Sequence, residues 1–356
     1  WYENLENYVG DLRFPALEAA DNAVRFEQEL ERHPASAELS RRPLMLEVLL
    51  LIHMERGPLP EDRHEAFSRL IEHLLRLHPE RRIRATRVGT VSFPVSEQSF
   101  RRMLSRLAFE MLISDNSAWT LTEICLWLTE QFQDAKSFAF SLEKSELTAN
   151  SFMSVLEENL GILVPKGFGH FGFLHRAIQE HLASGHVASW PLQAQLDFVT
   201  EYRFDPSQRE VVIGLFHFLN RPDEAECLAT LLRPTESREV IALTEMFAEV
   251  TLLSQKCSGA FARDALMLVG KSIEWSTDLE HRTRLLRVVL SALTNTAIIE
   301  DVANWLGSWY PRTNIFPESA LLKLREAPPD SNVLECLLLN LRNPDRSARR
   351  AAAQSL

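Results

Sequence analysis

The period of the apolar positions changes between residues 161 and 184. Residues 162–164 are a short apolar run, residues 165–169 contain proline and glycine, and Phe171 and Phe173 then alternate with other residues. Successive side chains of a strand point to opposite faces, so this arrangement predicts two short strands joined by a turn. The first half of the stretch is therefore expected to be a β-hairpin.

A helix is predicted directly after the hairpin. Its apolar positions, Leu174, Ile178 and Leu182, recur at every fourth residue. His175 and Gln179 form a polar stripe beside them. A histidine at a strand-to-helix junction, on the polar side of a helix, is placed to meet a ligand or a neighbouring domain. His175 is the sharpest functional candidate in the chain.

Three helices are predicted upstream of the hairpin, from Glu97 onward, over residues 120–132 and over residues 151–160. Three helices followed by a two-stranded wing are the order of a winged-helix domain. Many winged helices bind DNA through the third helix. Here that helix carries Glu157 and Glu158 and no Arg or Lys, which argues against DNA recognition.

Helices are also predicted for residues 1–82, where glycine is sparse. The strongest begins at Pro43, because a proline suits the first helical position. Residues 44–52 are apolar nearly all round, so this helix is expected to be buried. Gly57 and the two prolines that follow it end the helix, and a further helix covers about residues 61–77.

Serial short helices are predicted from about residue 191 to the end of the chain. Residues 332–356 read as a helix, an Asn-Pro-Asp turn and the start of a second helix, which resembles a HEAT repeat. The earlier helices share no fixed period. Because helical arrays usually bind partners, a pure scaffold and a partner-sensing surface are both open interpretations.

The composition is that of a soluble globular protein, with 46% hydrophobic and 24% charged residues. Lys+Arg 38 against Asp+Glu 49 gives a net charge of −11, which disfavours binding to nucleic acid. The four cysteines are scattered and no signal peptide is visible, which fits a cytoplasmic location.

The longest apolar run, residues 44–52, is far shorter than the ~20 residues of a membrane span. The chain lacks an initiator Met, and we interpret it as a segment of a longer protein.

The sequence contains one partial match to a catalytic motif. Residues 265–272 end in Gly270, Lys271 and Ser272, as in a Walker A loop, but Ala265 stands where the first glycine is needed and the pattern is helical. No metal-binding spacing joins His64, His73 and His78, and no GxSxG or HExxH occurs. The arginine-rich residues 78–98 fit a solvated linker or a contact with a nucleotide or acidic partner. No enzyme activity is expected from this segment alone.

Three motifs resemble those of NACHT proteins, which are signal-transducing STAND NTPases that include the NOD-like receptors and many bacterial defence proteins. Residues 173–184 resemble the Phe-x-His-x-x-x-Gln-Glu-Tyr-Leu-Ala-Ala motif that closes the family's winged-helix domain. Residues 40–46 and 57–60 resemble its Asn-Pro-Leu-Leu-Leu and Gly-x-Leu-Pro elements, and residues 161–163 match the Gly-Ile-Leu that opens the wing. The departures are Arg42, where Asn is usual, and His181, where Tyr is usual.

The resemblance implies a nucleotide-contacting role for two residues. The family's winged-helix histidine reaches the β-phosphate of ADP and holds a closed state, and His175 matches it. The family's helical-domain proline packs against the adenine, and Pro43 matches it. An imidazole N–H is a hydrogen-bond donor, which suits a phosphate. The structural alternatives are that His175 only caps the wing–helix junction and that Pro43 only starts a helix.

The fold class implied is mainly α, with a helical lid domain over residues 1–82, a winged-helix domain over 83–190 and a HEAT-like array over 191–356, truncated at its C-terminus. ADP or ATP is the implied cofactor. The phosphate-binding loop and the acidic residues that hold Mg²⁺ would lie before Trp1, so the segment is not expected to bind nucleotide tightly by itself.

The function implied is that of a two-state switch in signalling or defence. Its partners would be the upstream P-loop domain of the same protein, a protein ligand on the helical repeats and, on activation, further copies of itself. Two alternatives stay open. One is a nucleotide-independent helical-repeat adaptor, and the other, disfavoured by the acidic charge, is a winged-helix transcription regulator.

Overall fold

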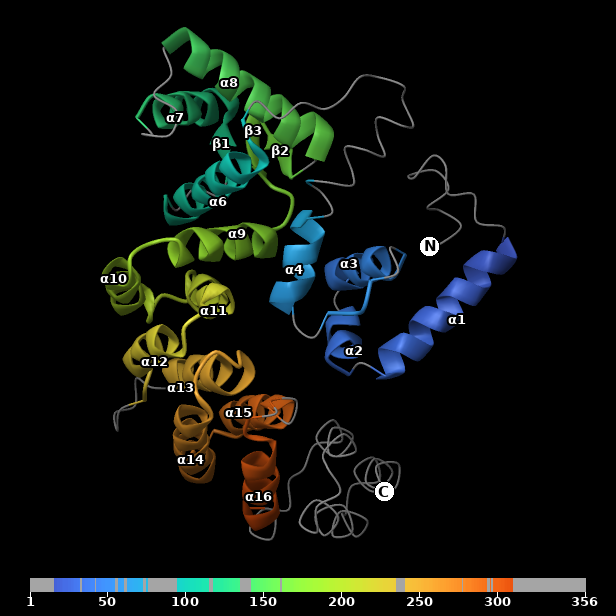
Figure 1. Cartoon of the computed structure of the whole chain (residues 1–356), viewed down its shortest axis with the longest axis vertical. Helices are drawn as coiled ribbons and strands as arrows, with labels where there is room; N and C mark the ends of the chain where they lie inside the picture. The colour runs from blue at the N-terminus through green and yellow to red at the C-terminus, as the bar shows by residue number, and fades with distance from the viewer. Residues whose placement is uncertain are drawn as a thin grey trace. The chain divides into compact units, whose positions relative to one another are not determined.

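A computed structural model describes two compact units, Trp1–His186 and Val187–Leu356, which are treated in turn (Figure 1). The described residues are 16–32, 34–41, 43–54, 57–60, 63–72, 75, 95–114, 118–134, 142–160, 162–234, 241–276, 278–292, 295 and 297–309. They are mainly helical and contain one small antiparallel sheet, as predicted. The predicted HEAT-like pair over 332–356 and most of the arginine-rich stretch lie outside them.

The first unit begins with four helices: α1 (Ala16–Arg32), α2 (Pro34–Ser40), α3 (Pro43–Met54) and α4 (Arg63–Glu72). Helix α3 starts at Pro43, as predicted, and contributes to two hydrophobic clusters. Met45, Val48 and Ile52 enter the main core, whereas Leu49 and Leu50 pack in a smaller cluster with Phe26 of α1. A helix with a core on two sides needs apolar residues nearly all round, which explains the sequence of α3.

The winged-helix elements follow in the predicted order. They are α6 (Glu97–Ile113), β1 (Trp119–Thr120), α7 (Leu121–Asp134), α8 (Leu142–Ser154) with its π-helical continuation η3 (Val155–Leu160), β2 (Leu163–Gly167) and β3 (His170–Phe173). The third helix begins at Leu142 rather than at residue 151, so its predicted start was wrong. Strand β1, which was not predicted, completes an antiparallel sheet of order β1-β3-β2 (Figure 1).

The main hydrophobic core of the first unit joins the winged-helix elements to helices α3 and α4. Phe100, Phe132 and Phe152 are fully buried at its centre, and the Phe100 and Phe152 rings lie 4.2 Å apart. The same core contains side chains of α3, α4, the wing and α9 (Arg176–Ala188). Helices α3 and α4 therefore pack directly against the winged-helix elements. The predicted domain limits at residues 82 and 190 stay predictions.

The second unit is a series of short helices, as predicted. They are α10 (Leu192–Tyr202), α11 (Arg209–Phe218), α12 (Pro222–Leu231), α13 (Ile241–Ala248) with its π-helical continuation η5 (Glu249–Leu253), α14 (Gly259–Trp275), α15 (Leu279–Ser291) and α16 (Ile299–Trp309). Near neighbours in sequence pack together: α10 with α12, α13 with α14 and α15, and α14 with α16. Their assignment as HEAT repeats stays a prediction.

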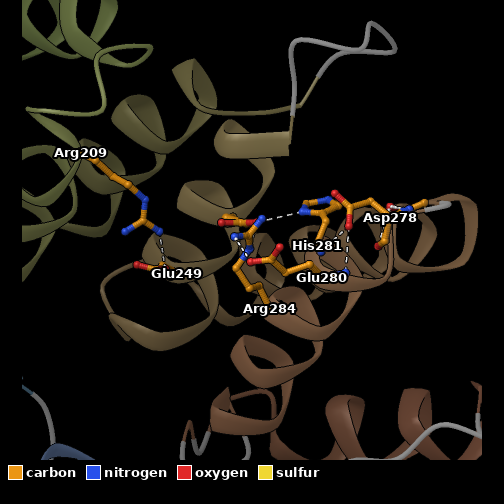
Figure 2. Close-up of polar contacts among 8 residues, drawn as sticks. Arg209, Glu249, Asp278, Glu280, His281 and Arg284 are labelled. Atoms are coloured by element: carbon orange, nitrogen blue, oxygen red, sulfur yellow. Dashed lines mark hydrogen bonds and ion pairs between the residues drawn. The ribbon is translucent and has the colours of Figure 1, made fainter. Parts of the chain in front are cut away.

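Polar side chains link these helices as well (Figure 2). Glu245 of α13 accepts a hydrogen bond from Nε of Arg284 at 2.8 Å, and Nδ1 of the buried His281 lies 3.0 Å from the same oxygen. Arg209 of α11 contacts Glu249 of η5 at 2.6 Å. Charged side chains thus join α13 to α15 and α11 to η5.

Helices α14 and α16 approach closely at Gly270. A Cβ atom at this position would lie 2.3 Å from Nε1 of Trp305, whose side chain is 9% exposed. Gly270 therefore serves helix packing. The Walker-like residues 265–272 lie inside α14, as the helical pattern predicted, and not in a phosphate-binding loop.

Gly270→Ala is expected to destabilise the chain. Overpacking against the nearly buried indole should cost about 3 kcal/mol, the upper end for such changes, because the ring cannot bend away. Alanine recovers about 1 kcal/mol through its better helix propensity, so the expected net loss in unfolding free energy is about 2 kcal/mol. Urea unfolding followed by tryptophan fluorescence measures it.

The matched control is Met267→Ala, on the same helix, where the side chain is 57% exposed. It should change the unfolding free energy by no more than about 0.5 kcal/mol. A Gly270→Ala chain as stable as the original would contradict the close approach of α14 and α16.

Candidate functional site

His175 lies at the junction of the wing and helix α9. The N–H of Leu174 still donates to the Ile162 carbonyl of the hairpin, at 2.8 Å. The His175 carbonyl then accepts from the N–H groups of Ile178 and Gln179, at 3.1 and 3.3 Å. Its Nδ1 accepts from the N–H of Ala177, at 3.1 Å. His175 is thus the N-cap residue of α9, with its side chain satisfying one of the free N–H groups of the first turn.

The cap determines which ring nitrogen of His175 can donate. Nδ1 accepts a hydrogen bond, so in the neutral ring the proton is on Nε2. The side chain is exposed, so Nε2–H is a donor at the start of a helix. The positive end of the α9 helix dipole also lies at this N-terminus. The His175 ring can therefore cap α9 and offer a hydrogen bond to an anion at the same time.

The polar and apolar stripes predicted for this helix were partly wrong. Leu174 precedes α9 and is 48% exposed, because the helix begins only at Arg176. Gln179 is 4% exposed, and its Nε2 donates to the Ala108 carbonyl of α6 at 3.2 Å. A buried amide is tolerated when it is hydrogen-bonded. Gln179 thus attaches α9 to α6, while Ile178 and Leu182 are buried as predicted.

A second attachment of α9 runs through His181, which stands where the family pattern has Tyr. The ring is 4% exposed, and its Nε2 lies 3.2 Å from Oγ of Ser68 on α4. It also stacks on His64, with ring centroids 5.9 Å apart, and contacts Phe67 at the same distance. Sequence reasoning missed this link, although His181 was noted as a departure.

Among the described residues, no group of three or more His, Cys, Asp or Glu side chains could hold a metal ion.

Pro43 is the exposed first residue of α3. Within the described part of the chain, no hydrogen bond, ion pair or ring contact links it to His175. The neighbouring Gly-x-Leu-Pro element packs inward: Leu59 and Pro60 are buried, and Oγ of Ser36 donates to the Pro60 carbonyl at 2.6 Å. The structure thus leaves both predicted site residues exposed and does not join them directly.

Three helices, a β-hairpin wing and a helix that returns to the core define a winged-helix domain. Residues 63–187 match the family described as the winged helix-turn-helix domain C-terminal to NACHT. This stretch of the chain is such a domain, which implies a NACHT-associated C-terminal region. The match contains His175 and begins after Pro43. No curated protein and no solved structure matches the chain.

None of the described helices combines the length and the apolar character that crossing a bilayer requires.

His186, near the end of α9, has a strongly shifted pKa. Burial, with a smaller contribution from the charge of Arg106, lowers the pKa of His186 to about 4. Its ring also packs against Phe109 of α6, with centroids 5.4 Å apart. His186 is therefore neutral at physiological pH, and it belongs to the packing between α9 and α6.

This lowered pKa makes the stability of the domain depend on pH. On acidification the unfolded chain protonates His186 near its ordinary pKa of 6.5, whereas the folded chain does so only near 4. The stabilisation is present above about pH 6.5 and is lost as the pH falls towards about 4. Allowing for the partial exposure of the ring, we expect a loss on the order of 2 kcal/mol.

His186→Gln supplies the comparison, because glutamine does not titrate. Between about pH 7 and pH 4, the unfolding free energy of the original chain should fall by on the order of 2 kcal/mol more than that of the variant. Urea unfolding at several pH values measures both. Parallel pH profiles would show that His186 does not contribute.

Proposed function

We propose that the chain is the regulatory portion of a NACHT-type STAND NTPase, in which His175 contacts the phosphates of a nucleotide held by the P-loop domain of the full-length parent. The observation that carries the proposal is the geometry of His175. It lies within the matched winged-helix domain, the motif around it resembles the family's, and its Nδ1 is engaged so that Nε2–H is the exposed donor.

The proposed chemistry of the contact is simple. A hydrogen bond to a charged group is worth more than one between neutral groups, about 1.5–3 kcal/mol, so one imidazole can bias a two-state equilibrium between closed and open forms. Pro43, exposed at the start of α3, would pack against the adenine ring. ADP bound in this way would favour the closed form, and exchange for ATP would release the winged helix.

The second unit would sense a partner. Its serial helices suit a HEAT-like array, and such arrays bind proteins on extended surfaces. Partner binding there, together with nucleotide exchange, would allow the parent to oligomerise. We further propose that the parent acts in the cytoplasm, in signalling or defence. The acidic net charge of −11 speaks against nucleic acid as the partner.

A nucleotide-independent adaptor is the second candidate, and one observation favours it. The His175 ring already has a structural task as the N-cap of α9, and that task needs no nucleotide. An experiment on His175 must therefore separate capping from phosphate binding.

Two substitutions achieve this separation. Serine is a good N-cap without an imidazole, whereas alanine lacks both properties. In the full-length parent, His175→Ser and His175→Ala should both weaken ADP binding by about tenfold or more and raise basal activity, because both remove the Nε2–H donor. Titration of the parent with ADP measures the affinity.

The unfolding free energy of the 356-residue chain, measured without nucleotide, reports on the capping role of His175 alone. There, alanine should lower the unfolding free energy by about 1 kcal/mol and serine by much less. If ADP affinity follows capping instead, so that serine preserves it and alanine lowers it, then His175 is only a structural residue. Unchanged affinity in both variants would exclude the contact and favour the adaptor.

A further inference from the structure

Gln179 joins the capping histidine to helix α6 through a single residue. Its backbone N–H donates to the His175 carbonyl at 3.3 Å, which closes the first turn of α9. Its side-chain Nε2 donates to the Ala108 carbonyl of α6 at 3.2 Å, and the residue is buried. One residue therefore contacts both the backbone of the candidate site and the interior of the winged-helix domain.

The first turn of α9 has two buried residues, Ile178 and Gln179, whereas Arg176 is exposed and Ala177 is half-buried. Ile178 packs in the main core, and apolar packing has no preferred direction. A hydrogen bond, in contrast, is favourable only over a narrow range of distance and angle. The amide of Gln179 is therefore the contact that fixes the rotation of this turn about the helix axis.

The direction of the His175 ring depends on this rotation. Nδ1 of the ring accepts from the N–H of Ala177 at 3.1 Å, so the ring is held against the same turn that Gln179 closes. If the turn rotates or shifts, the ring and its Nε2–H move with it. A displacement of about 1 Å can weaken a positioned contact by as much as about a hundredfold. The orientation of the turn thus decides whether Nε2–H can reach an acceptor.

The other polar attachment of α9 lies further from His175. Nε2 of His181 is 3.2 Å from Oγ of Ser68 on α4, and His181 stands near the middle of the helix. It is more than one turn beyond His175, since an α-helix has about 3.6 residues per turn. The His181 contact therefore holds the middle of α9, whereas Gln179 holds its start.

We propose that Gln179 is a positioning residue of the nucleotide contact. By attaching the first turn of α9 to the Ala108 carbonyl, it aims the Nε2–H of His175 at the phosphates without touching the nucleotide itself. This inference rests on the proposed function and adds a route of regulation to it. Because linkage is reciprocal, a shift of α6 against α9 changes the affinity for ADP, and bound ADP holds α9 on α6.

Gln179→Met tests this role, because methionine has a similar length and lacks the amide donor. The Ala108 carbonyl lies inside α6 and keeps its intrahelical hydrogen bond, so the urea midpoint of the 356-residue chain should change little. In that chain without nucleotide, the amide hydrogen of Ala177, which is bonded to the His175 ring, should exchange with solvent about three- to tenfold faster. In the full-length parent, the dissociation constant of ADP should rise by about three- to tenfold.

Ser68→Ala is the matched control, because it removes the α4 partner of His181 and leaves Gln179 intact. The exchange rate of Ala177 and the affinity for ADP should both stay within about twofold. Equal effects of Ser68→Ala and Gln179→Met would overturn the proposal, as would an unchanged exchange rate of Ala177 in Gln179→Met.

The His175→Ala parent separates this proposal from the function on which it rests. If His175→Ala weakens ADP binding and Gln179→Met does not, Gln179 is no positioning residue. If His175→Ala itself leaves ADP binding unchanged, the proposed function fails, and the nucleotide role of Gln179 fails with it.

Discussion

The first unit depends on its main hydrophobic core. The rings of Phe100, Phe132 and Phe152 at its centre bring together α6, α7 and α8, and the same core extends to α3, α4, the wing and α9. Apolar area removed from water is the largest favourable contribution to folding. Because these elements share one interior, the position of each is determined by the others. The surface features of this unit, including the exposed His175, are held by that interior.

The core acts on the candidate site through the buried face of α9. Ile178 and Leu182 enter the core, and the amide of Gln179 and the ring of His181 are hydrogen-bonded or packed against α6 and α4. With one broad face of the helix engaged, α9 is attached to the core and its N-cap residue is left at the surface. A site residue on a rigid element keeps its geometry better than one on a loop.

Most of this arrangement could be predicted from the sequence, and the exceptions have physical causes. Local sequence rules predicted three of its features: the start of α3 at Pro43, the order of the helices and the hairpin. These rules are the period of the apolar positions and the preference of proline for the first helical position. Strand β1 has only two residues, too few to show alternation, and it exists because β3 offers it a partner. Gln179 was placed in a polar stripe from its residue type and spacing alone. Its burial depends on the Ala108 carbonyl, 71 positions away, which no local pattern reveals.

The central claim is that one imidazole both caps α9 and binds a phosphate. A structure of the full-length parent with ADP tests it most directly. The account predicts that Nδ1 of His175 still accepts from the N–H of Ala177 while Nε2 lies about 3 Å from a phosphate oxygen. A nucleotide bound with the His175 ring turned away from it, or out of hydrogen-bond reach, would contradict the account.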